Sequence, residues 1–471
     1  MMNLDFVFPE IFLSLSIMFL LMIGVFKKKS EKLVYNLSTI ILVILLALVV
    51  NLFSVDEMFI FNEGYKIDKL SSFMKSLTIL SAIFVMISSS SYLKFLNILK
   101  IEYPILILSS ILGMMVMISS NDLIVFYLGL ELQSLALYVL ASFNRDNILS
   151  SESGLKYFVL SALSSGLLLY GCSLVYGFSG STNFININIS SVNSDYGVIF
   201  GLVFIIVGLA FKITAVPFHM WAPDVYQGSP TSVTLFFAAL PKVAALTVII
   251  RFLFIPFANL IDQWQTILIF ISIASMVFGA VAAIGQSNLK RLIAYSSIGH
   301  MGYALAGVAS GTNQGIQSSI TYMSIYLVMT LAFFSCLLML RKKNDYYEKI
   351  EDLSGLSINH PILSLSLLVV LFSLAGIPPL AGFFAKFYVF MAVIEQGMFF
   401  LAIIGLLSTV IAAFYYLRLI KIIYFDKSKE NFETDHNFGL KATLTITTGI
   451  LVLYFLYPRF LNEVVSQIVV L

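Results

Sequence analysis

The chain has 471 residues, of which 59% are hydrophobic and only 11% are charged, and its mean hydropathy is +0.97. Soluble globular domains average about 25% charged residues, so this composition excludes a soluble enzyme, a disordered protein and a nucleic-acid-binding protein. The formal net charge of +2 is also too balanced for a polyanionic partner. The sequence therefore predicts an all-α, polytopic membrane protein surrounded by a lipid bilayer.

Apolar stretches of about 20 residues, the length that a helix needs to cross a bilayer, recur along the whole chain. They predict about fourteen spanning helices, near 9–26, 33–54, 70–92, 102–119, 122–143, 154–178, 197–217, 231–255, 263–285, 291–310, 315–340, 360–390, 397–424 and 440–460. The stretches are continuous rather than alternating, so spanning strands are not expected. Asp5 and Glu10 open the first stretch and its basic run follows it, which indicates a span rather than a cleavable signal.

Basic residues set the orientation of such a bundle, because they concentrate in the loops on the inner side. With the N-terminus outside, the inner side receives most of the 27 basic residues, namely Lys27, Lys28, Lys29, Lys32, Lys94, Lys100, Arg145, Lys290, Arg291, Arg341, Lys342, Lys343, Lys349, Arg418, Lys421, Lys427, Lys429 and Lys441. The outer side receives Lys66, Lys69, Lys75, Arg251 and Arg459. This asymmetry predicts an even number of spans with both termini outside.

Four lysines assigned to neither side, together with the only acid well inside a predicted span, are candidate functional residues, because an isolated charge within the membrane is costly. They are Glu131, Lys156, Lys212, Lys242 and Lys386. A structural acid is the alternative for Glu131, a lysine that extends to the interface is the alternative for Lys212, and an interfacial anchor is the alternative for Lys156. Lys242 is near mid-membrane, where such an extension is difficult. A buried lysine whose neighbouring charge can change is suited to act as a proton switch.

Two of the spans are interrupted by prolines, one around Pro217 and one at Pro378 and Pro379. Proline breaks a helix, and non-helical backbone at membrane depth needs protein or water to cover it. Each break lies in the fourth span of a five-span block, spans 4–8 and 9–13. Because five is odd, the second block is expected to be inverted relative to the first, which is typical of transporters.

The ionisable residues of the two blocks are predicted to form one row along the membrane plane, with Glu131, Lys212 and Lys242 from the first block and Lys386 from the second. His219 and His300 are further candidates, because imidazole titrates near neutral pH and can relay protons. A histidine satisfied by ordinary hydrogen bonds is the alternative for each. The chain divides in this interpretation into residues 1–101, 102–256, 257–425 and 426–471.

Motifs for cofactors are absent from the sequence. It contains neither the phosphate-binding G-x-x-x-x-G-K-[S/T] pattern nor a G-x-G-x-x-G dinucleotide fingerprint. Its histidine spacing does not suit haem, and Cys172 and Cys336 are too few for an iron–sulfur cluster, so they are expected to be packing residues. Energy must therefore come from an ion gradient or from a partner protein, with no cofactor and no metal held by this chain.

Four segments carry a resemblance to the antiporter-like subunits of respiratory complex I, the NADH:quinone oxidoreductase. They are 211–230 (FKITAVPFHMWAPDVYQGSP), 240–242 (LPK), 288–303 (NLKRLIAYSSIGHMGY) and 376–383 (GIPPLAGF). The resemblance extends over most of 105–425. Within this family the chain is most similar to the N-type subunits, because it has Lys386 where one sibling has a glutamate and lacks the long lateral helix of another.

The resemblance implies proton pumping driven by quinone reduction elsewhere in the complex. It also implies that Glu131 pairs with Lys212, that Lys242 bridges to a central axis, that Lys386 lies toward the outlet and that Lys156 is the sixth-helix lysine of the family. NADH, FMN, iron–sulfur clusters and quinone would be bound by partner subunits, and the sibling antiporter-like subunits would be neighbours in a bacterial inner membrane. An organelle-encoded homologue in an organellar inner membrane would have similar features.

Two alternatives remain from the sequence. The same fold serves in Mrp-type cation/proton antiporters, which would work without a quinone reductase arm. A purely structural membrane scaffold is the other alternative, and it would leave proton pumping intact when Lys212 or Lys242 is replaced.

Overall fold

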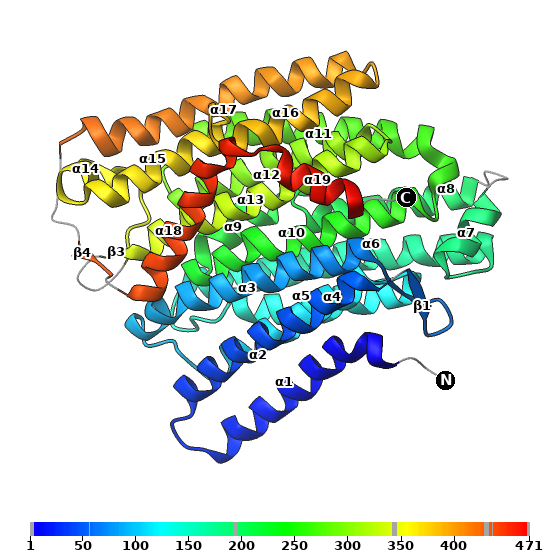
Figure 1. The fold of residues 1–471 in the computed structure, drawn as a ribbon, viewed down its shortest axis with the longest axis horizontal. Helices are drawn as coiled ribbons and strands as arrows, with labels where there is room; N and C mark the ends of the chain where they lie inside the picture. Colours follow the sequence, from blue (N-terminus) through cyan, green and yellow to red (C-terminus); the bar gives the residue numbers. More distant parts are fainter. Residues whose placement is uncertain are drawn as a thin grey trace.

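The fold is described from a computed structural model, which describes residues 4–55, 57–191, 196–341, 346–427, 433–435 and 437–468. Nineteen α-helices dominate these residues, and most run along one common direction (Figure 1). The predicted all-α membrane class is therefore confirmed. Three basic residues counted on the inner side, Lys342, Lys343 and Lys429, lie outside the described residues.

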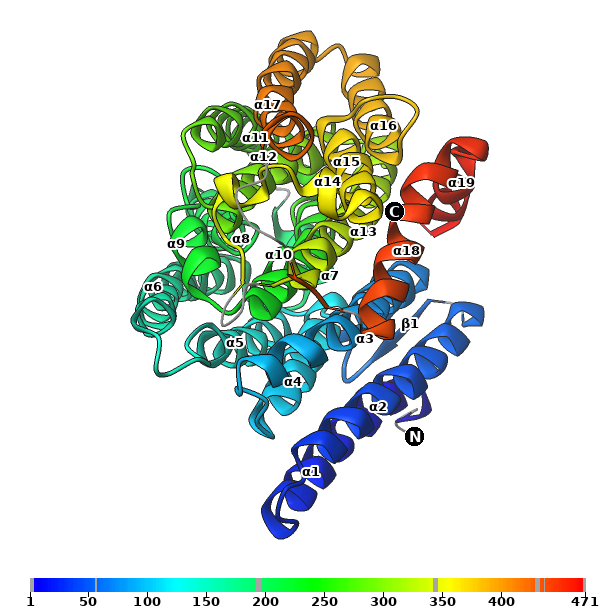
Figure 2. The same cartoon turned by 90° about the vertical axis from the view of Figure 1, so that its left-hand side faces the viewer.

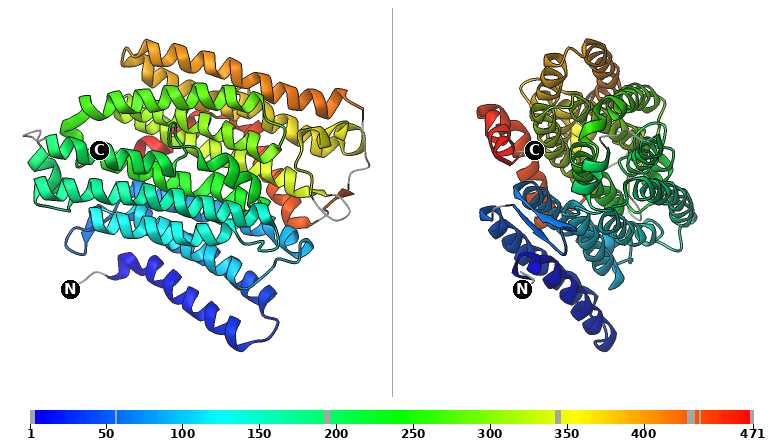
Figure 3. Two further views of the ribbon diagram at one scale, coloured as in Figure 1. Left: turned by 180° about the vertical axis from the view of Figure 1, so that it is seen from behind. Right: turned by 90° about the vertical axis from the view of Figure 1, so that its right-hand side faces the viewer.

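The N-terminal region contains three long helices and a hairpin. Its elements are the 3₁₀ turn η1 (Leu4–Val7), α1 (Phe8–Phe26), α2 (Glu31–Asn51), η2 (Leu52–Ser54), β1 (Met58–Ile60), β2 (Tyr65–Ile67) and α3 (Lys69–Phe95). The strands β1 and β2 pair antiparallel outside the spans. Asp68 caps α3 by accepting a hydrogen bond from the Ser71 backbone N–H. The helices α1 and α2 pack together at one edge of the molecule (Figure 3).

The two five-span blocks follow in chain order. The first has α4 (Glu102–Ile118), α5 (Leu123–Ala141), α6 (Ile148–Ser179), α7 (Phe184–Ser191), α8 (Tyr196–Lys212), α9 (Trp221–Gly228) and α10 (Thr231–Phe254). The second has η3 (Ala258–Leu260), α11 (Ile261–Ile284), α12 (Leu289–Ala309), α13 (Asn313–Met339), β3 (Leu340–Arg341), η4 (Ile350–Leu353), α14 (Leu356–Asn359), α15 (Pro361–Ala375), α16 (Ala381–Glu395) and α17 (Phe399–Phe425). The C-terminal region adds β4 (Glu433–Thr434), α18 (Phe438–Leu453), η5 (Tyr454–Leu456) and α19 (Arg459–Ile468).

Each of the fourteen expected spans corresponds to a helix or a broken pair of helices. Within the described residues, 10 helical segments are long and apolar enough to cross a membrane, and α4, α8 and α15 are shorter apolar helices. The remaining expected span is α12, a 21-residue helix that carries Lys290, Arg291 and His300. The expected breaks are present, because eight residues separate α8 from α9 and five separate α15 from α16.

The interior of the bundle is formed by α10 and α13. In the most apolar 18-residue stretch of each helix, 100% of the residues of α10 and 94% of those of α13 are buried. In the corresponding stretch that includes α1, only 33% are buried. An end-on view shows the other helices arranged around this pair (Figure 2). The exposed large apolar side chains lie mainly on peripheral helices such as α1, α6 and α17, as expected of surfaces that face lipid.

The first two helices of each block pack in the same way. A Cβ atom added at Gly113 of α4 would lie 2.4 Å from the backbone nitrogen of Gln133 on α5, and one added at Gly279 of α11 would lie 2.6 Å from that of Gly299 on α12. Glycine therefore permits backbone contact at both crossings. This shared packing supports the internal repeat, for which the similarity of the two sequences is weak.

Three basic residues that were counted toward the inner or outer side are buried within helices. Lys75 of α3 pairs with Glu10 at 2.6 Å, Arg251 of α10 pairs with Asp68 at 2.6 Å, and Lys290 of α12 pairs with Glu348 at 2.5 Å. Each of the three is exposed by 3% or less. Placing Lys290 in an inner loop was wrong. For all three residues, an acidic partner distant in sequence compensates the charge and lets it remain buried.

Candidate functional site: a row of buried lysines

Lys212 ends α8 inside the first block. Its Nζ donates hydrogen bonds to Ser134 Oγ at 2.7 Å and to Ser161 Oγ at 2.8 Å. The same amine lies 6.0 Å from the centroid of the Tyr138 ring, and the Tyr138 hydroxyl donates to Ser161 Oγ at 2.6 Å. Only 7% of Lys212 is exposed, so the alternative of a lysine that extends to the interface does not hold.

Carbonyls at the end of α8 are bonded by groups from the break that follows Lys212. The Trp221 indole N–H donates to the carbonyl of Phe211 at 3.0 Å, and Ala215 N–H donates to the carbonyl of Ala210 at 2.8 Å. Thr214 adopts a left-handed backbone conformation at φ 63°. The chain thereby turns from α8 into α9 at membrane depth with its carbonyls covered by protein.

Glu131 lies on α5, one turn before Ser134, and is half-buried. Its Oε1 is buried and has no hydrogen-bond partner. Among the described residues Glu131 forms no direct ion pair, because the Lys212 amine is bonded to the two serine hydroxyls instead. Glu131 shares a face of α5 with Ser134, which bonds the Lys212 amine, so the carboxylate and the amine belong to one cluster.

Lys242 lies in the middle of α10 and is 1% exposed. Its Nζ has no hydrogen-bond partner in the described part of the chain. Two aromatic rings face it instead, with centroids at 5.7 Å for Tyr226 of α9 and 5.6 Å for Tyr326 of α13. Ring faces stabilise a cation but do not accept its proton in a conventional hydrogen bond. The Lys242 amine is therefore not tied to one hydrogen-bond acceptor.

His300 of α12 continues the row from Lys242. Its ring centroid lies 5.2 Å from that of Tyr326, the ring that also faces Lys242. Its Nδ1 is 2.6 Å from the Tyr322 hydroxyl and its Nε2 is 3.2 Å from the Tyr416 hydroxyl. Each ring nitrogen therefore faces a group that can both donate and accept a proton. Ordinary hydrogen bonds satisfy the ring, and the same bonds connect it to its neighbours.

Lys386 of α16 lies at the second break. Its Nζ donates to the carbonyls of Leu374 at 3.2 Å and Ala375 at 2.9 Å, which are the last carbonyls of α15. The amine is 5.0 Å from the centroid of the Tyr303 ring, and Lys386 is 6% exposed. Gly376, at φ 85°, ends α15 in the left-handed conformation that favours glycine.

A small cavity joins His300 to Lys386. Both side chains line it, together with Tyr303, Tyr416 and Ser296. The cavity has a volume of ≈ 10 Å³, which is enough for about one water molecule. Lys242, His300 and Lys386 are thus linked by aromatic, hydroxyl and cavity contacts, and none of the three side chains reaches the surface of the chain.

Two of the predicted site residues lie apart from this row. The side chain of Lys156 is 40% exposed and pairs with Glu152 at 2.7 Å and with Asp224 at 2.8 Å. His219 lies on the segment between α8 and α9, where its ring packs on Phe278 of α11 at 4.6 Å. Within the described residues, no hydrogen bond or ion pair connects either residue to the buried lysines.

The hydroxyl and aromatic partners of the row were missed in the sequence. They are Ser134, Tyr138, Ser161, Tyr226, Tyr303, Tyr322, Tyr326 and Tyr416. A weak signal existed, because Ser134 follows Glu131 by three residues and Tyr326 follows Tyr322 by four, which places each pair on one helix face. The described residues contain no group of three or more His, Cys, Asp or Glu side chains that could hold a metal ion.

Comparisons with known proteins identify the family. Residues 120–412 match the family model described as NADH:quinone oxidoreductase/Mrp antiporter, TM. The chain is 72% identical over 466 residues to NADH-quinone oxidoreductase subunit N of Pelagibacter ubique, covering 99% of both chains. The chain belongs to the NADH-quinone oxidoreductase subunit N family. It is a multi-pass membrane protein of that family.

Solved structures share the fold of this chain. A chain in the structure of respiratory complex I from Thermus thermophilus with bound aureothin matches with a TM-score of 0.82 at 29% identity, covering 97% of this chain and 98% of that one. A chain of the Mrp complex from Dietzia matches with a TM-score of 0.87 at 19% identity, covering 99% and 97%. The second likeness concerns the fold alone.

Proposed function

We propose that this subunit N family member translocates protons within the membrane arm of an NADH-quinone oxidoreductase. Quinone reduction elsewhere in the complex would drive the pumping, and NADH, FMN, iron–sulfur clusters and quinone would be bound by partner subunits. The single observation that supports this most strongly is the burial of Lys212, Lys242 and Lys386, each at 7% exposure or less, among hydroxyl and aromatic side chains.

The proposed role of each residue follows from its contacts. Glu131 modulates the charge on Lys212, whose two serine hydroxyls can pass a proton onward. Lys242, which has no hydrogen-bond partner, exchanges protons with the His300 region, and Lys386 lies toward the outlet. Lys156 and His219, which lie apart from the row, have supporting roles at most. The sibling antiporter-like subunits and the bilayer of a bacterial inner membrane are the proposed surroundings.

The blocks 102–256 and 257–425 are proposed to be the two working halves of this subunit, with 1–101 and 426–471 as flanking regions. The likeness to the Mrp complex does not favour an independent antiporter, because it extends to fold only. Copurification discriminates between the two assemblies: a quinone-reducing arm travels with this chain in the proposed function, whereas sodium-dependent flux without that arm indicates an Mrp-type antiporter.

The decisive experiment replaces Lys212 or Lys242 with alanine in the intact complex. Proton pumping into membrane vesicles is measured together with NADH oxidation and with the amount of assembled complex. We expect pumping to be lost at normal assembly, because the row then lacks a proton carrier. Normal pumping in both variants would support a structural scaffold and reject the proposal.

A further inference from the structure

The short helix α9 contacts the surroundings of two lysines of the row. At its start, Trp221 bonds the carbonyl of Phe211, the residue before Lys212. Near its end, the Tyr226 ring faces Lys242 at 5.7 Å. The position of this eight-residue helix therefore affects both sites.

Charged residues at the beginning of α12 hold α9 in place. Arg291 Nη1 pairs with Asp224 of α9 at 2.5 Å and donates to Gln227 Oε1 at 3.2 Å. Asp224 also pairs with Lys156 of α6 at 2.8 Å. These contacts attach α9 to its neighbours through partly exposed groups, which exchange partners with water at little cost.

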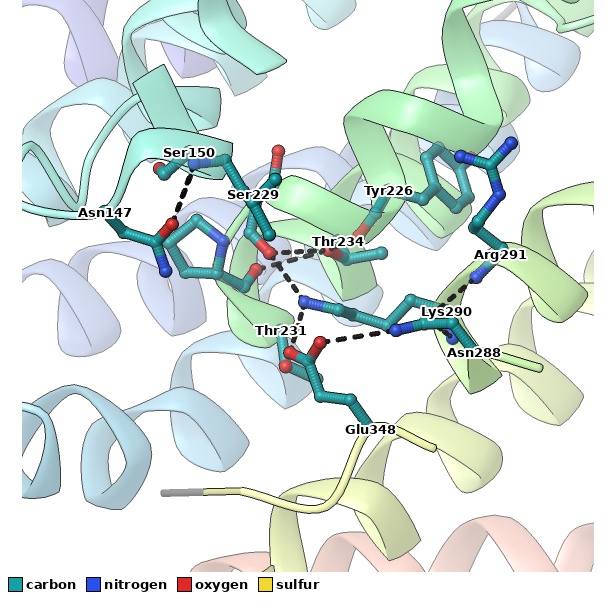
Figure 4. A network of polar contacts seen from close by, with 12 residues as sticks. Asn147, Ser150, Tyr226, Ser229, Thr231, Thr234, Asn288, Lys290, Arg291 and Glu348 are labelled. Carbon is teal, nitrogen blue, oxygen red and sulfur yellow. Dashed lines mark hydrogen bonds and ion pairs between the residues drawn. The ribbon is translucent and has the colours of Figure 1, made fainter. Parts of the chain in front are cut away.

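Lys290, the neighbour of Arg291, makes a different kind of contact. Its side chain is 3% exposed, and its Nζ donates to the carbonyl of Ser229 at 3.1 Å, directly after the end of α9. The same amine pairs with Glu348 Oε1 at 2.5 Å. Figure 4 shows the lysine lying between the Ser229 carbonyl and the Glu348 carboxylate.

Glu348 belongs to a segment of the second block, residues 346–353, that lies between α12 and α3 of the N-terminal region. The carbonyl of Glu348 accepts from Leu289 N–H at 2.7 Å, and Ile350 N–H donates to the carbonyl of Ser287 at 2.9 Å. At the start of this segment the Tyr346 ring packs on Tyr92 of α3, with centroids 4.6 Å apart. The segment thus connects α12 with α3 and supplies the acid that neutralises Lys290.

A buried ion pair contributes little net stability, because desolvation offsets the attraction between the charges. Its better attested use is to specify one arrangement of the elements that it joins. Here the lysine bonds a backbone carbonyl at the end of α9, which cannot move away without leaving the buried amine short of an acceptor. The contact is therefore suited to fixing the position of α9.

We propose that Lys290, held by Glu348, is a positioning residue that fixes the end of α9 and thereby keeps the Tyr226 ring against Lys242. This inference rests on the proposed function, because the ring that Lys290 positions faces Lys242, which is proposed to carry protons. Because Lys290 and Glu348 belong to the second block and α9 belongs to the first, this contact connects the second block with the site of the first.

The test uses the intact complex in native membranes, with pumping rate normalised to the amount of assembled complex. We expect Lys290→Met to lower that rate about tenfold. This is the loss expected if α9 keeps its present position in only about one molecule in ten. Lys290→Arg, which keeps the charge and the donors, should retain most of the rate. Lys421→Met, which removes an exposed lysine of α17, is the matched control and should pump normally.

Coupling to Tyr226 distinguishes positioning from a general structural role. In a Tyr226→Leu background, Lys290→Met should cause little further loss, because both changes disturb the same contact. The inference would be overturned if the fold-losses of the two single variants multiplied in the double variant, or if Lys290→Met pumped normally. Should Lys290→Met prevent assembly, Glu348→Gln at the partly exposed acid provides the same comparison. Normal pumping by Lys242→Ala would instead reject the proposed function itself.

Discussion

The serine pair that holds Lys212 provides the sharpest test of the site. Ser161 Oγ accepts hydrogen bonds from the Lys212 amine at 2.8 Å and from the Tyr138 hydroxyl at 2.6 Å. Ser161→Ala removes this shared acceptor without adding volume or charge. The amine then retains only Ser134 Oγ, at 2.7 Å, as a hydrogen-bond partner.

The expected magnitude follows from the type of bond that is lost. A hydrogen bond to a charged group contributes about 1.5–3 kcal/mol, and about 1.4 kcal/mol corresponds to a tenfold change in an equilibrium constant. Ser134 and a water molecule in the space left behind would recover part of this free energy. We therefore expect the pumping rate to fall about tenfold through loss of the protonated state of Lys212.

Proton uptake into vesicles, normalised to assembled complex, measures this effect. Ser165→Ala is a matched control, because Ser165 lies one turn further along α6, is 5% exposed and has an Oγ without a hydrogen-bond partner. This control should pump at the normal rate. If Ser161→Ala pumps like the control, the serine hydroxyls do not hold a working amine and the reasoning fails.

Three further changes test other parts of the molecule. Glu131→Gln should slow pumping about tenfold, because it removes the charge that acts on Lys212; normal pumping would mean that this carboxylate is not part of the switch. Lys242→Arg should also impair pumping severely, because arginine stays protonated. If this variant pumps normally in the vesicle assay, Lys242 does not need to lose its proton. Burial raises the pKa of Asp68, but the Arg251 guanidinium, the hydrogen bonds from Ser71 and the Lys66 ammonium together outweigh burial and leave the pKa below its usual value. The pair should therefore stabilise the complex above about pH 4 and lose that contribution as the pH falls. Asp68→Asn should remove this pH dependence in thermal inactivation curves, and an unchanged profile would contradict it.

The sequence was sufficient to predict the spans, the two breaks and the three buried lysines of the row, Lys212, Lys242 and Lys386. Long apolar runs, prolines at 217 and 378, and a lysine within two turns of each break are local features, so periodicity and composition reveal them. The same local rules placed Lys290 in a loop. Nothing near Lys290 in the sequence indicates Glu348, because that acid follows 58 residues later and meets it only in the fold.

The partners of the amines were equally inaccessible to sequence reasoning. Serine and tyrosine are common in apolar helices, and only packing decides which of them face an amine. Ser161 contacts Lys212 because α6 packs against α8, whereas the hydroxyl of Ser165 on the same helix has no hydrogen-bond partner among the described residues. The expected direct pair of Glu131 and Lys212 depended on side-chain geometry in the same way, and the serines take the place of the carboxylate around the amine.

The two breaks hold their lysines by different chemistry, and this difference bears on how the halves work. The Lys212 amine is bonded to hydroxyls, which can rotate from acceptor to donor when the amine loses its proton. The Lys386 amine is bonded to the last carbonyls of α15, where a positive charge also favours the helix dipole. Carbonyls cannot become donors, so a neutral Lys386 can satisfy them less well and the end of α15 should loosen. Hydrogen exchange at this helix end should rise in Lys386→Met, while unchanged protection would show that the helix does not depend on the charge. When Lys212 loses its proton in the first block, we thus expect only the bonded side chains to rearrange. When Lys386 loses its proton in the second block, we expect the backbone at the end of α15 to change as well.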